Sequence, residues 1–266
     1  MSADSQQYGS GLLRQIGVVG QRSVKRTLRQ PAAIIPPIIF PLILLGISSA
    51  GLSKATSIPG FPADRYFDFL LVVPFMQGAL FATTAAGLAL GQDIEGGFLN
   101  RLALTPIRAS ALILGQMAGA AVLSSISATI YILVGLLAGV DFQSGIGGIV
   151  VLFVLAVATG VGFATIGAYF ALRAGTAEAV QGLFPILFAA LFLSTMNMPL
   201  DLIEKDWFHF LAKWNPVSAM IGGMRSLIID SWDIGALWRD VAVLVALLTL
   251  GVTGSAIALR GRLTRT

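Results

Sequence analysis

Six long apolar runs most strongly constrain what this chain can fold into. They cover residues 32–51, 69–90, 109–138, 147–172, 179–197 and 241–259. Each is close to, or longer than, the roughly 20 residues that an α-helix needs to cross the hydrocarbon core of a bilayer. With 56% hydrophobic and only 11% charged residues, the composition is that of a polytopic membrane protein. We therefore predict an all-α fold with six transmembrane helices in a single domain, residues 1–266.

The segment before the first run, residues 1–31, predicts a cytoplasmic helix on the membrane surface. It lacks the apolar region and the small-residue cleavage site of a signal peptide. Leu12, Ile16 and Val19 recur at helical spacing, and basic residues lie between and after them. This pattern is typical of an amphipathic interfacial helix, and a solvated basic tail is the alternative.

Prolines interrupt the start of the first run. Pro36, Pro37 and Pro41 each lack the N–H group that a helix ladder requires. We expect a kinked or partly unwound helix, which the bilayer tolerates only where neighbouring helices cover the freed carbonyl groups.

The basic residues predict the orientation of the chain. On the side of the termini lie eleven: Arg14, Arg22, Lys25, Arg26, Arg29, Arg101, Arg108, Arg173, Arg260, Arg262 and Arg265. On the other side lie six: Lys54, Arg65, Lys205, Lys213, Arg225 and Arg239. The positive-inside bias then places both termini in the cytoplasm, with the chain in a bacterial plasma membrane. Because anionic headgroups and topology explain the net charge of +4, nucleic acid is not an expected partner.

The types of residue present argue against a metal site, a catalytic site or an ATP-binding loop on this chain. There is no cysteine, and the single histidine, His209, cannot assemble a histidine metal cluster. No Asp, Glu, Lys, Arg or His falls inside the six predicted spans, which disfavours ion-coupled carriers and intramembrane hydrolases. No lysine directly follows a glycine, so the chain cannot supply a Walker-type phosphate loop.

The larger polar side chains in the spans have two possible roles. They either line a translocation path or form hydrogen bonds between helices, which membrane proteins commonly use. These residues are Gln77, Gln116, Tyr131, Tyr169, Gln181 and Asn197. Three glycine pairs, Gly87 with Gly91, Gly115 with Gly119, and Gly135 with Gly139, match the small-residue pattern of close helix packing.

The long outer segment, residues 198–240, contains two apolar stretches that are too short to span. They cover residues 200–211 and 217–229, and Trp214, Asn215 and Pro216 separate them. We expect two short re-entrant helices joined at the Asn-Pro turn, with an interfacial loop held by aromatic side chains as the alternative.

Three groups of residues resemble one family of membrane proteins. The segment between the second and third runs resembles the cytoplasmic motif of ABC type 2 exporter permeases, particularly of the daunorubicin-resistance branch. The matching residues are Asp93, Gly97, Arg101, Pro106 and Arg108, followed by Gly115. The outer segment resembles the part of the family's chain that precedes the last helix, with Asn215 and Pro216, then Arg225 and Leu227, as the matching residues. The start of the first run resembles the start of the family's first helix, with Arg29, Pro31 and Pro41 as the matching residues.

This resemblance implies an architecture and partners. It implies six transmembrane helices, an amphipathic N-terminal helix, a coupling helix between helices 2 and 3, and re-entrant outer helices before helix 6. It also implies a homo- or heterodimer of permeases in contact with membrane lipids. Separate ABC ATPase subunits at the cytoplasmic face would bind ATP and Mg, and this chain would hold no cofactor.

Under the same resemblance, residues 92–106 contain the coupling helix. Ile94, Phe98 and Leu102 then form one apolar face, and Asp93, Glu95 and Arg101 offer polar contacts to the ATPase. Gly96 and Gly97 permit a sharp start and Pro106 ends the helix. The alternative is a polar hairpin that only joins two spans.

The expected function is ATP-driven export of an amphipathic, drug-like or lipid-like molecule. Export of a lipid-linked glycan by the same architecture is one alternative, and an ATP-independent secondary carrier or channel is another. An integral-membrane enzyme is disfavoured because no catalytic constellation can be assembled from these residues.

Overall fold

The computed structural model describes residues 11–97 and 109–263, and the regular elements within these ranges are all helical. The N-terminal half contains α1 (Leu12–Leu28), α2 (Pro31–Gly51), α3 (Tyr66–Leu70), α4 (Val73–Glu95) and α6 (Ala109–Leu137). The C-terminal half contains α7 (Gly145–Ala174), α8 (Ala177–Gln181), α9 (Leu183–Phe192), α10 (Asp206–Trp214), α11 (Pro216–Ile229) and α12 (Ile234–Leu263). Two short 3₁₀ helices, Ser53–Ser57 and Leu200–Leu202, lie in the connections.

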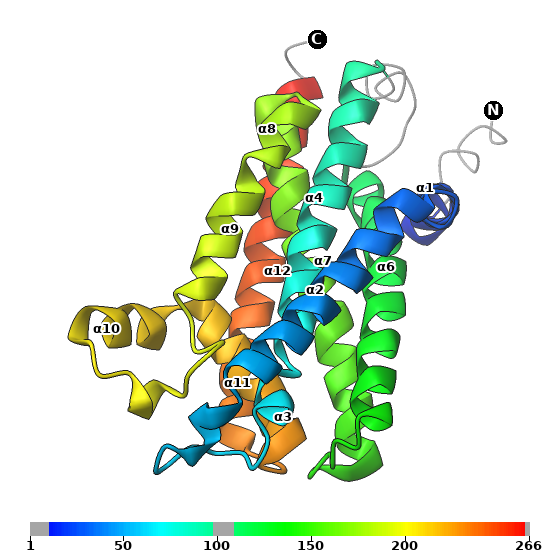
Figure 1. Cartoon of the computed structure of the whole chain (residues 1–266). Helices are drawn as coiled ribbons and strands as arrows, with labels where there is room; N and C mark the ends of the chain where they lie inside the picture. Colours follow the sequence, from blue (N-terminus) through cyan, green and yellow to red (C-terminus); the bar gives the residue numbers. More distant parts are fainter. Residues whose placement is uncertain (1–10, 98–108, 264–266) are drawn as a thin grey trace, which may run out of the picture.

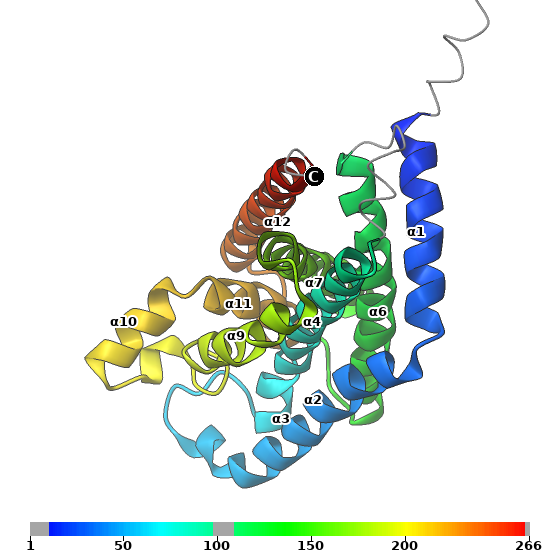
Figure 2. The same cartoon turned by 90° about the horizontal axis from the view of Figure 1, so that it is seen from above.

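Five stretches within the described residues are long and apolar enough to cross a membrane. They are Pro31–Gly51, Tyr66–Glu95, Ala111–Leu137, Gly145–Ala174 and Ile234–Arg262. The stretch that contains α4 is the most enclosed, with 78% of its most apolar window buried, against 17% for α2 and for α12. α4 therefore lies at the centre of the bundle, as the view from above shows (Figure 2). A multi-pass helical membrane protein is confirmed.

The predicted fifth span, residues 179–197, is divided in the structure. α8 ends at Gln181, α9 begins at Leu183, and the chain turns after Phe192. The break follows from Pro185, because a proline ring clashes with the carbonyl group four residues earlier, here that of Gln181. Together the two pieces cover only Ala177–Phe192, about 24 Å of helix, which is shorter than the hydrocarbon core of about 30 Å. The six-span count therefore stays a prediction.

The last span begins seven residues earlier than predicted. α12 starts at Ile234 rather than at residue 241, so the polar pair Arg239 and Asp240 belongs to the helix. Asp240 is fully buried, with 0% of its surface exposed. The expectation that the spans contain no ionisable side chain is therefore wrong at this position.

α2 remains helical through all three of its internal prolines. Pro41 has no N–H group to donate to the carbonyl oxygen of Pro37, and the buried hydroxyl of Tyr131, on α6, donates to that oxygen instead. The neighbouring helix thus covers the freed carbonyl group, as the sequence predicts.

Glycines set the closest helix contacts. An added Cβ at Gly167 of α7 would lie 2.0 Å from the carbonyl oxygen of Thr83 on α4, so the two backbones touch. Of the six glycines in the predicted packing pairs, five lie against a neighbouring element at a distance that leaves no room for a methyl group: Gly87, Gly91, Gly115, Gly119 and Gly135. Gly139 has nothing within 4 Å and instead adopts a positive φ of 72° in the turn after α6.

α1 lies beside α6 and across the direction of the bundle, since Figure 1 shows it nearly end-on while α4, α7 and α12 run along the page. An added Cβ at Gly115 would lie 2.5 Å from the Cβ of Val19, so the contact with α6 is close. This is the placement expected of a helix on a membrane surface, and its position relative to lipid stays a prediction.

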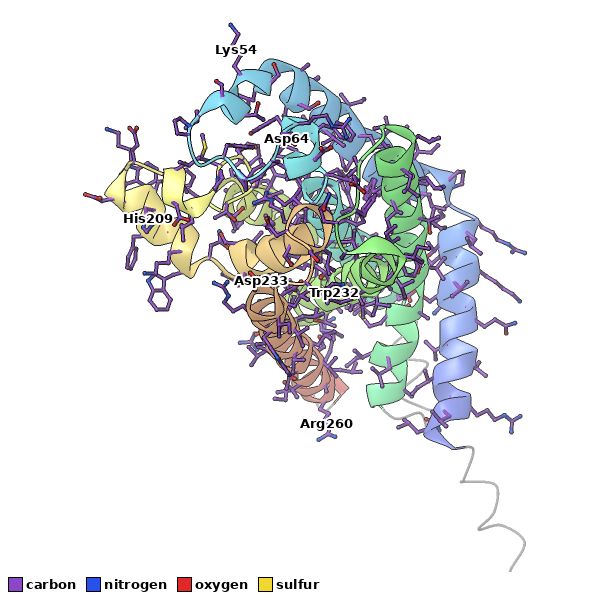
Figure 3. All side chains as sticks on the ribbon, turned by 90° about the horizontal axis from the view of Figure 1, so that it is seen from below. Lys54, Asp64, His209, Trp232, Asp233 and Arg260 are labelled. Atoms are coloured by element: carbon purple, nitrogen blue, oxygen red, sulfur yellow. The ribbon has the colours of Figure 1, made fainter. Side chains whose placement is uncertain are left out.

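The two ends of the bundle differ. One end collects the C-terminal ends of α4, α7 and α12 together with α8 (Figure 1), and Gly175 lies against the guanidinium of Arg262 there. The opposite end carries α3, α10, α11 and the 3₁₀ helix of Lys54, and Figure 3 looks onto it with Lys54 and His209 toward the edge of the view. We refer to these as the inner and the outer end, and their assignment to cytoplasm and exterior stays a prediction.

Candidate functional site

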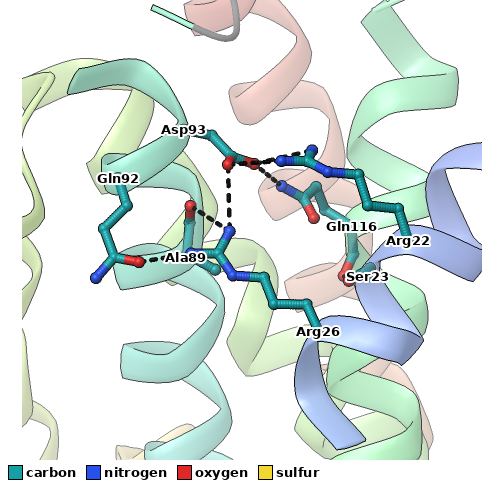
Figure 4. Close-up of polar contacts among 7 residues, drawn as sticks. All are labelled: Arg22, Ser23, Arg26, Ala89, Gln92, Asp93 and Gln116. Carbon is teal, nitrogen blue, oxygen red and sulfur yellow. Dashed lines mark hydrogen bonds and ion pairs between the residues drawn. The ribbon is translucent and has the colours of Figure 1, made fainter. Parts of the chain in front are cut away.

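A polar cluster joins three helices near the inner end. Asp93, in the last turns of α4, is only 7% exposed, and its carboxylate accepts hydrogen bonds from α1 and α6. Arg22 donates to Oδ1 at 3.0 Å and to Oδ2 at 3.3 Å, and Arg26 donates to Oδ1 at 3.2 Å. The side-chain amide of Gln116 donates to Oδ2 at 3.1 Å. Figure 4 shows these contacts, and we call Arg22, Arg26, Gln92, Asp93 and Gln116 the inner polar cluster.

The packing of α1 against α6 brings the two arginines to this carboxylate. They are four residues apart and therefore lie on one face of α1. Ser23, between them, donates to the backbone carbonyl of Gln116 at 3.0 Å. Arg26 also donates to the carbonyl oxygen of Ala89 at 3.2 Å and to Oε1 of Gln92 at 2.5 Å. α1 is thus attached to the end of α4 by charge and to α6 by close packing.

The exposed fractions indicate which group depends most on this cluster. The side chain of Asp93 is 8% exposed, whereas those of Arg22 and Arg26 are 44% and 25% exposed. Removing the carboxylate leaves two arginines that retain access to water, whereas removing the arginines leaves a buried anion. The ion pairs therefore stabilise Asp93 more than they stabilise either arginine.

Glu95 makes a second internal contact two residues later. Its Oε1 accepts a hydrogen bond from the backbone N–H of Ala177, at the start of α8, at 2.8 Å. Gly91 lies directly beneath, since an added Cβ there would be 2.7 Å from the Cα of Ala177. The acidic residues predicted to contact an ATPase are thus engaged within the chain, and their contact with a partner stays a prediction.

The backbone after α4 turns at the two glycines. Gly96 follows the last helical residue, and Gly97 has a φ of 67°, a left-handed conformation that favours glycine. Ile94 therefore lies in the last turn of α4, where it is half-buried against a cluster of buried apolar side chains that includes Leu90 and Leu112. The other predicted coupling residues, Phe98, Arg101, Leu102, Pro106 and Arg108, lie outside the described residues.

At the outer end, Arg225 of α11 holds three segments together. It is 7% exposed, and it donates to the backbone carbonyl oxygens of Phe69 at 3.1 Å, Thr195 at 3.0 Å and Met196 at 3.1 Å. Its guanidinium also lies 3.6 Å from the centroid of the Phe69 ring. Because it is buried, Arg225 does not contact headgroups as the topology count assumes.

Asn215 and Pro216 start α11 as the sequence predicts. The side-chain oxygen of Asn215 accepts from the backbone N–H of Val217 at 2.9 Å, and Pro216 occupies the first helical turn. The amide nitrogen of Asn215 donates to the carbonyl oxygens of Ala190 and Leu193, at 2.7 and 3.1 Å. Two short helices, α10 and α11, lie on either side of this turn as predicted, with α10 beginning at Asp206 rather than at residue 200. Their outer side and re-entrant character stay predictions.

The predicted translocation-path residues do not form one group. Gln116 and Tyr131 are used in helix contacts, and Gln181 lies exposed on α8 near the inner end. Gln77 and Asn197 line the same cavity of about 90 Å³ between α2, α4 and the chain after α9. Gln77 is 2% exposed, and its Oε1 has no hydrogen-bond partner within the described ranges.

Sequence comparisons relate most of the chain to known transporters. A profile of the family described as "ABC-2 type transporter" matches residues 14–229. The daunorubicin resistance ABC transporter permease protein DrrB1 of Streptomyces coeruleorubidus is 24% identical over 222 residues, which is 80% of this chain and 74% of that protein. The putative transport permease ycf38 of Porphyra purpurea is 28% identical over 264 residues, covering 93% and 88%. The protein of the same name from Cyanophora paradoxa is 30% identical over 229 residues, covering 82% and 76%.

Proposed function

Because the chain belongs to the ABC-2 type transporter family, we propose that it is the permease subunit of an ATP-driven exporter. Separate ABC ATPase subunits dock at the inner end, which faces the cytoplasm of a bacterial cell, and bind ATP and Mg there. A second permease chain completes the transport unit. This chain supplies the membrane path and has no nucleotide site of its own.

The inner polar cluster is the observation that supports this proposal most directly. It lies at the end of α4, immediately before the turn at Gly97 and the segment in which the sequence predicts a coupling helix. A movement of the ATPase that displaces residues 98–108 also displaces the end of α4. The hydrogen bonds of Asp93 to Arg22 and Gln116 then couple this displacement to α1 and α6. A rigid connection of this kind is what a transmission step requires, because coupling needs an element that responds as a unit.

The cargo we propose is amphipathic and drug-like or lipid-like. The name of the Streptomyces relative refers to daunorubicin resistance, and the helix surfaces of this chain are strongly apolar. An apolar cavity of about 390 Å³, with Phe210, Trp214 and Leu247 among its lining residues, lies between α10 and the bundle. Cavities of this size and character accommodate apolar ligands and lipid chains. A lipid-linked glycan remains the alternative cargo for the same architecture.

One apolar face of α2 is exposed in the single chain, and a second permease chain could cover it. Ile35, Ile39, Ile43 and Ile47 are spaced by four residues on this helix, and each is at least half exposed in the single chain. Such a stripe contacts either lipid or a second copy. Whether that second chain is identical to this one is decided by which permease co-purifies.

The proposal is tested by charge reversal in the reconstituted complex. We expect Arg101→Glu to reduce cargo-stimulated ATP hydrolysis by about tenfold or more, because a charged contact at the ATPase interface is replaced by repulsion. The matched control is Arg14→Glu, which reverses an exposed charge of α1 outside the inner polar cluster and is expected to leave stimulation unchanged. Undiminished stimulation in Arg101→Glu, with the complex intact, would contradict the coupling role of this segment.

A secondary carrier is the second candidate, and Asp240 is the observation that favours it. A buried carboxyl group inside a span is what ion-coupled transport commonly uses. Liposomes that contain only the purified chain separate the two functions. We expect no cargo flux from this chain under an imposed pH gradient without ATP and its ATPase partner, and flux under those conditions would favour the carrier.

A further inference from the structure

Asp240 is a buried carboxyl group that has no role in the ATP-driven export proposed above. It lies in α12, two turns from the start of the helix, and none of its surface is exposed. Neither carboxyl oxygen has a hydrogen-bond partner within the described ranges. This contrasts with Asp93, whose carboxylate receives hydrogen bonds from three side chains.

The backbone of α11 closes directly over this carboxyl group. An added Cβ at Gly223 would lie 2.4 Å from the Cβ of Asp240 and 2.8 Å from its Oδ2. Only a glycine leaves room for the carboxyl group there. Gly222, the preceding residue of the same helix, has nothing within 4 Å, so the close approach is confined to one face of α11. The group is enclosed as long as α11 stays packed on α12.

Within the described residues, the helices with the largest contacts to α12 offer this carboxyl group no free cation. They are α6, α7 and α11. α6 contains only Tyr131 as a titratable group, and it donates to Pro37. α7 contains only Tyr169 and, at its far end, Arg173. Tyr169 lies against Gly254, more than three turns from Asp240.

The charged residues closest to Asp240 in sequence lie in α11, just after it and at the start of α12, whereas Arg260 and Arg262 lie in the last turn of α12, at least 20 residues away. Arg225 uses its guanidinium on the three carbonyl oxygens of Phe69, Thr195 and Met196. Asp230 follows the last residue of α11. Asp233 accepts from the N–H of Ala236, and the exposed Arg239 donates to the carbonyl oxygen of Gly235. None of them makes a hydrogen bond to Asp240.

We propose that Asp240 is a proton-binding site enclosed by the contact between α11 and α12. A buried carboxylate without a counterion or hydrogen-bond donor is far costlier than the neutral acid, so the group carries a proton while the helices are packed. The O–H bond forms with a proton from water before α11 closes, and it breaks, returning the proton to water, only when α11 separates from α12. The inference does not depend on ATP or on a partner chain.

Infrared spectroscopy of the full-length chain in lipid nanodiscs tests the protonation directly. At neutral pH the spectrum of the wild type minus that of Asp240→Asn is expected to contain the C=O stretching band of a protonated carboxylic acid. Incorporation of ¹³C-labelled aspartate must shift this band, and this measurement needs no variant if Asp240→Asn fails to fold. The absence of an aspartate acid band at neutral pH would overturn the proposal.

Exchange into D₂O tests the enclosure. The acid band shifts when its proton is replaced by deuterium, and we expect this to be slow in the wild type. Gly223→Ala forces a methyl group against Asp240, so its exchange is expected to be about tenfold faster or more. Gly222→Ala adds the same methyl group where there is open space, so its rate is expected to equal that of the wild type. Equal rates in both variants would overturn the claim that α11 encloses the proton.

Discussion

At the scale of single residues, two charged side chains are buried and hydrogen-bonded within the chain. Asp93 and Arg225 are each about nine-tenths buried, and each connects three segments of the chain through hydrogen bonds. One lies near the inner end and the other near the outer end. A charge that is fully hydrogen-bonded and buried fixes geometry, because each partner that moves away leaves a group unsatisfied.

For Asp93 we expect Asp93→Asn to lower the stability of the folded chain. The amide retains the shape of the side chain and loses both ion pairs, and the expected loss is about 1–3 kcal/mol. Thermal unfolding in detergent measures it. Glu178→Gln, which neutralises an exposed acidic residue of α8, serves as the control and is expected to leave the midpoint unchanged. Equal midpoints for Asp93→Asn and the control would show that the ion pairs do not contribute.

For Arg225 we expect the substitution Arg225→Lys to be nearly as harmful as the loss of the residue. A lysine carries one compact ammonium group, which cannot reproduce the planar fork that reaches three separate carbonyl oxygens. The thermal midpoint of Arg225→Lys is expected to fall close to that of Arg225→Met. Arg239→Lys, at an exposed position of α12, controls for the exchange itself. A wild-type midpoint for Arg225→Lys would contradict the role of the fork.

At the scale of elements, the attachment of α1 to α6 depends on small residues. Gly20 faces Ala118, and Gly119 faces Ser23 and Thr27. These contacts let α1 lie close enough for Arg22 and Arg26 to reach Asp93 on a third helix. Close packing and charge are therefore expected to act together at the inner end.

This coupling predicts the effect of Gly115→Ala. The new methyl group would meet Val19 at 2.5 Å, and overpacking of this kind costs about 1–3 kcal/mol. With α1 displaced, trypsin is expected to cleave after Arg22, Lys25 or Arg26 several times faster than in the wild type. Gly17→Ala, on α1 with nothing within 4 Å, is expected to leave the cleavage rate unchanged. If both variants are cleaved at the wild-type rate, the glycine contact does not hold α1 in place.

The elements also differ in how well sequence predicts them. α6 and α7 match the predicted boundaries within two residues, because uninterrupted apolar runs define them. α9 differs from the prediction because Pro185 breaks a run that is mainly apolar. α12 differs because the charged residues Arg239 and Asp240 are typical of a loop, so the predicted span begins after them. The contact between Arg22 and Asp93 joins residues 71 positions apart. Local pattern does not specify such a pairing, since it depends on how α1 packs on α6.

At the scale of the whole molecule, the two main groups of polar contacts lie at opposite ends of the bundle. The inner end has the cluster around Asp93 and the segment that the sequence assigns to an ATPase contact, whereas the outer end has the two short helices held by Arg225 and Asn215 (Figure 1). Between them α4 and α7 touch along their backbones at Thr83 and Gly167. A rearrangement that starts at one end is therefore expected to reach the other through the packed centre of the bundle.

The central claim is that an ATPase docks at the inner end, and site-directed cross-linking tests it most directly. The chain has no cysteine, so each introduced cysteine is unique. In membranes from the native host, Arg101→Cys is expected to cross-link to an ATPase subunit with a Walker motif. Lys54→Cys, exposed at the outer end (Figure 3), is expected to give no such adduct. Capture of the ATPase through Lys54→Cys and not through Arg101→Cys would contradict the claim.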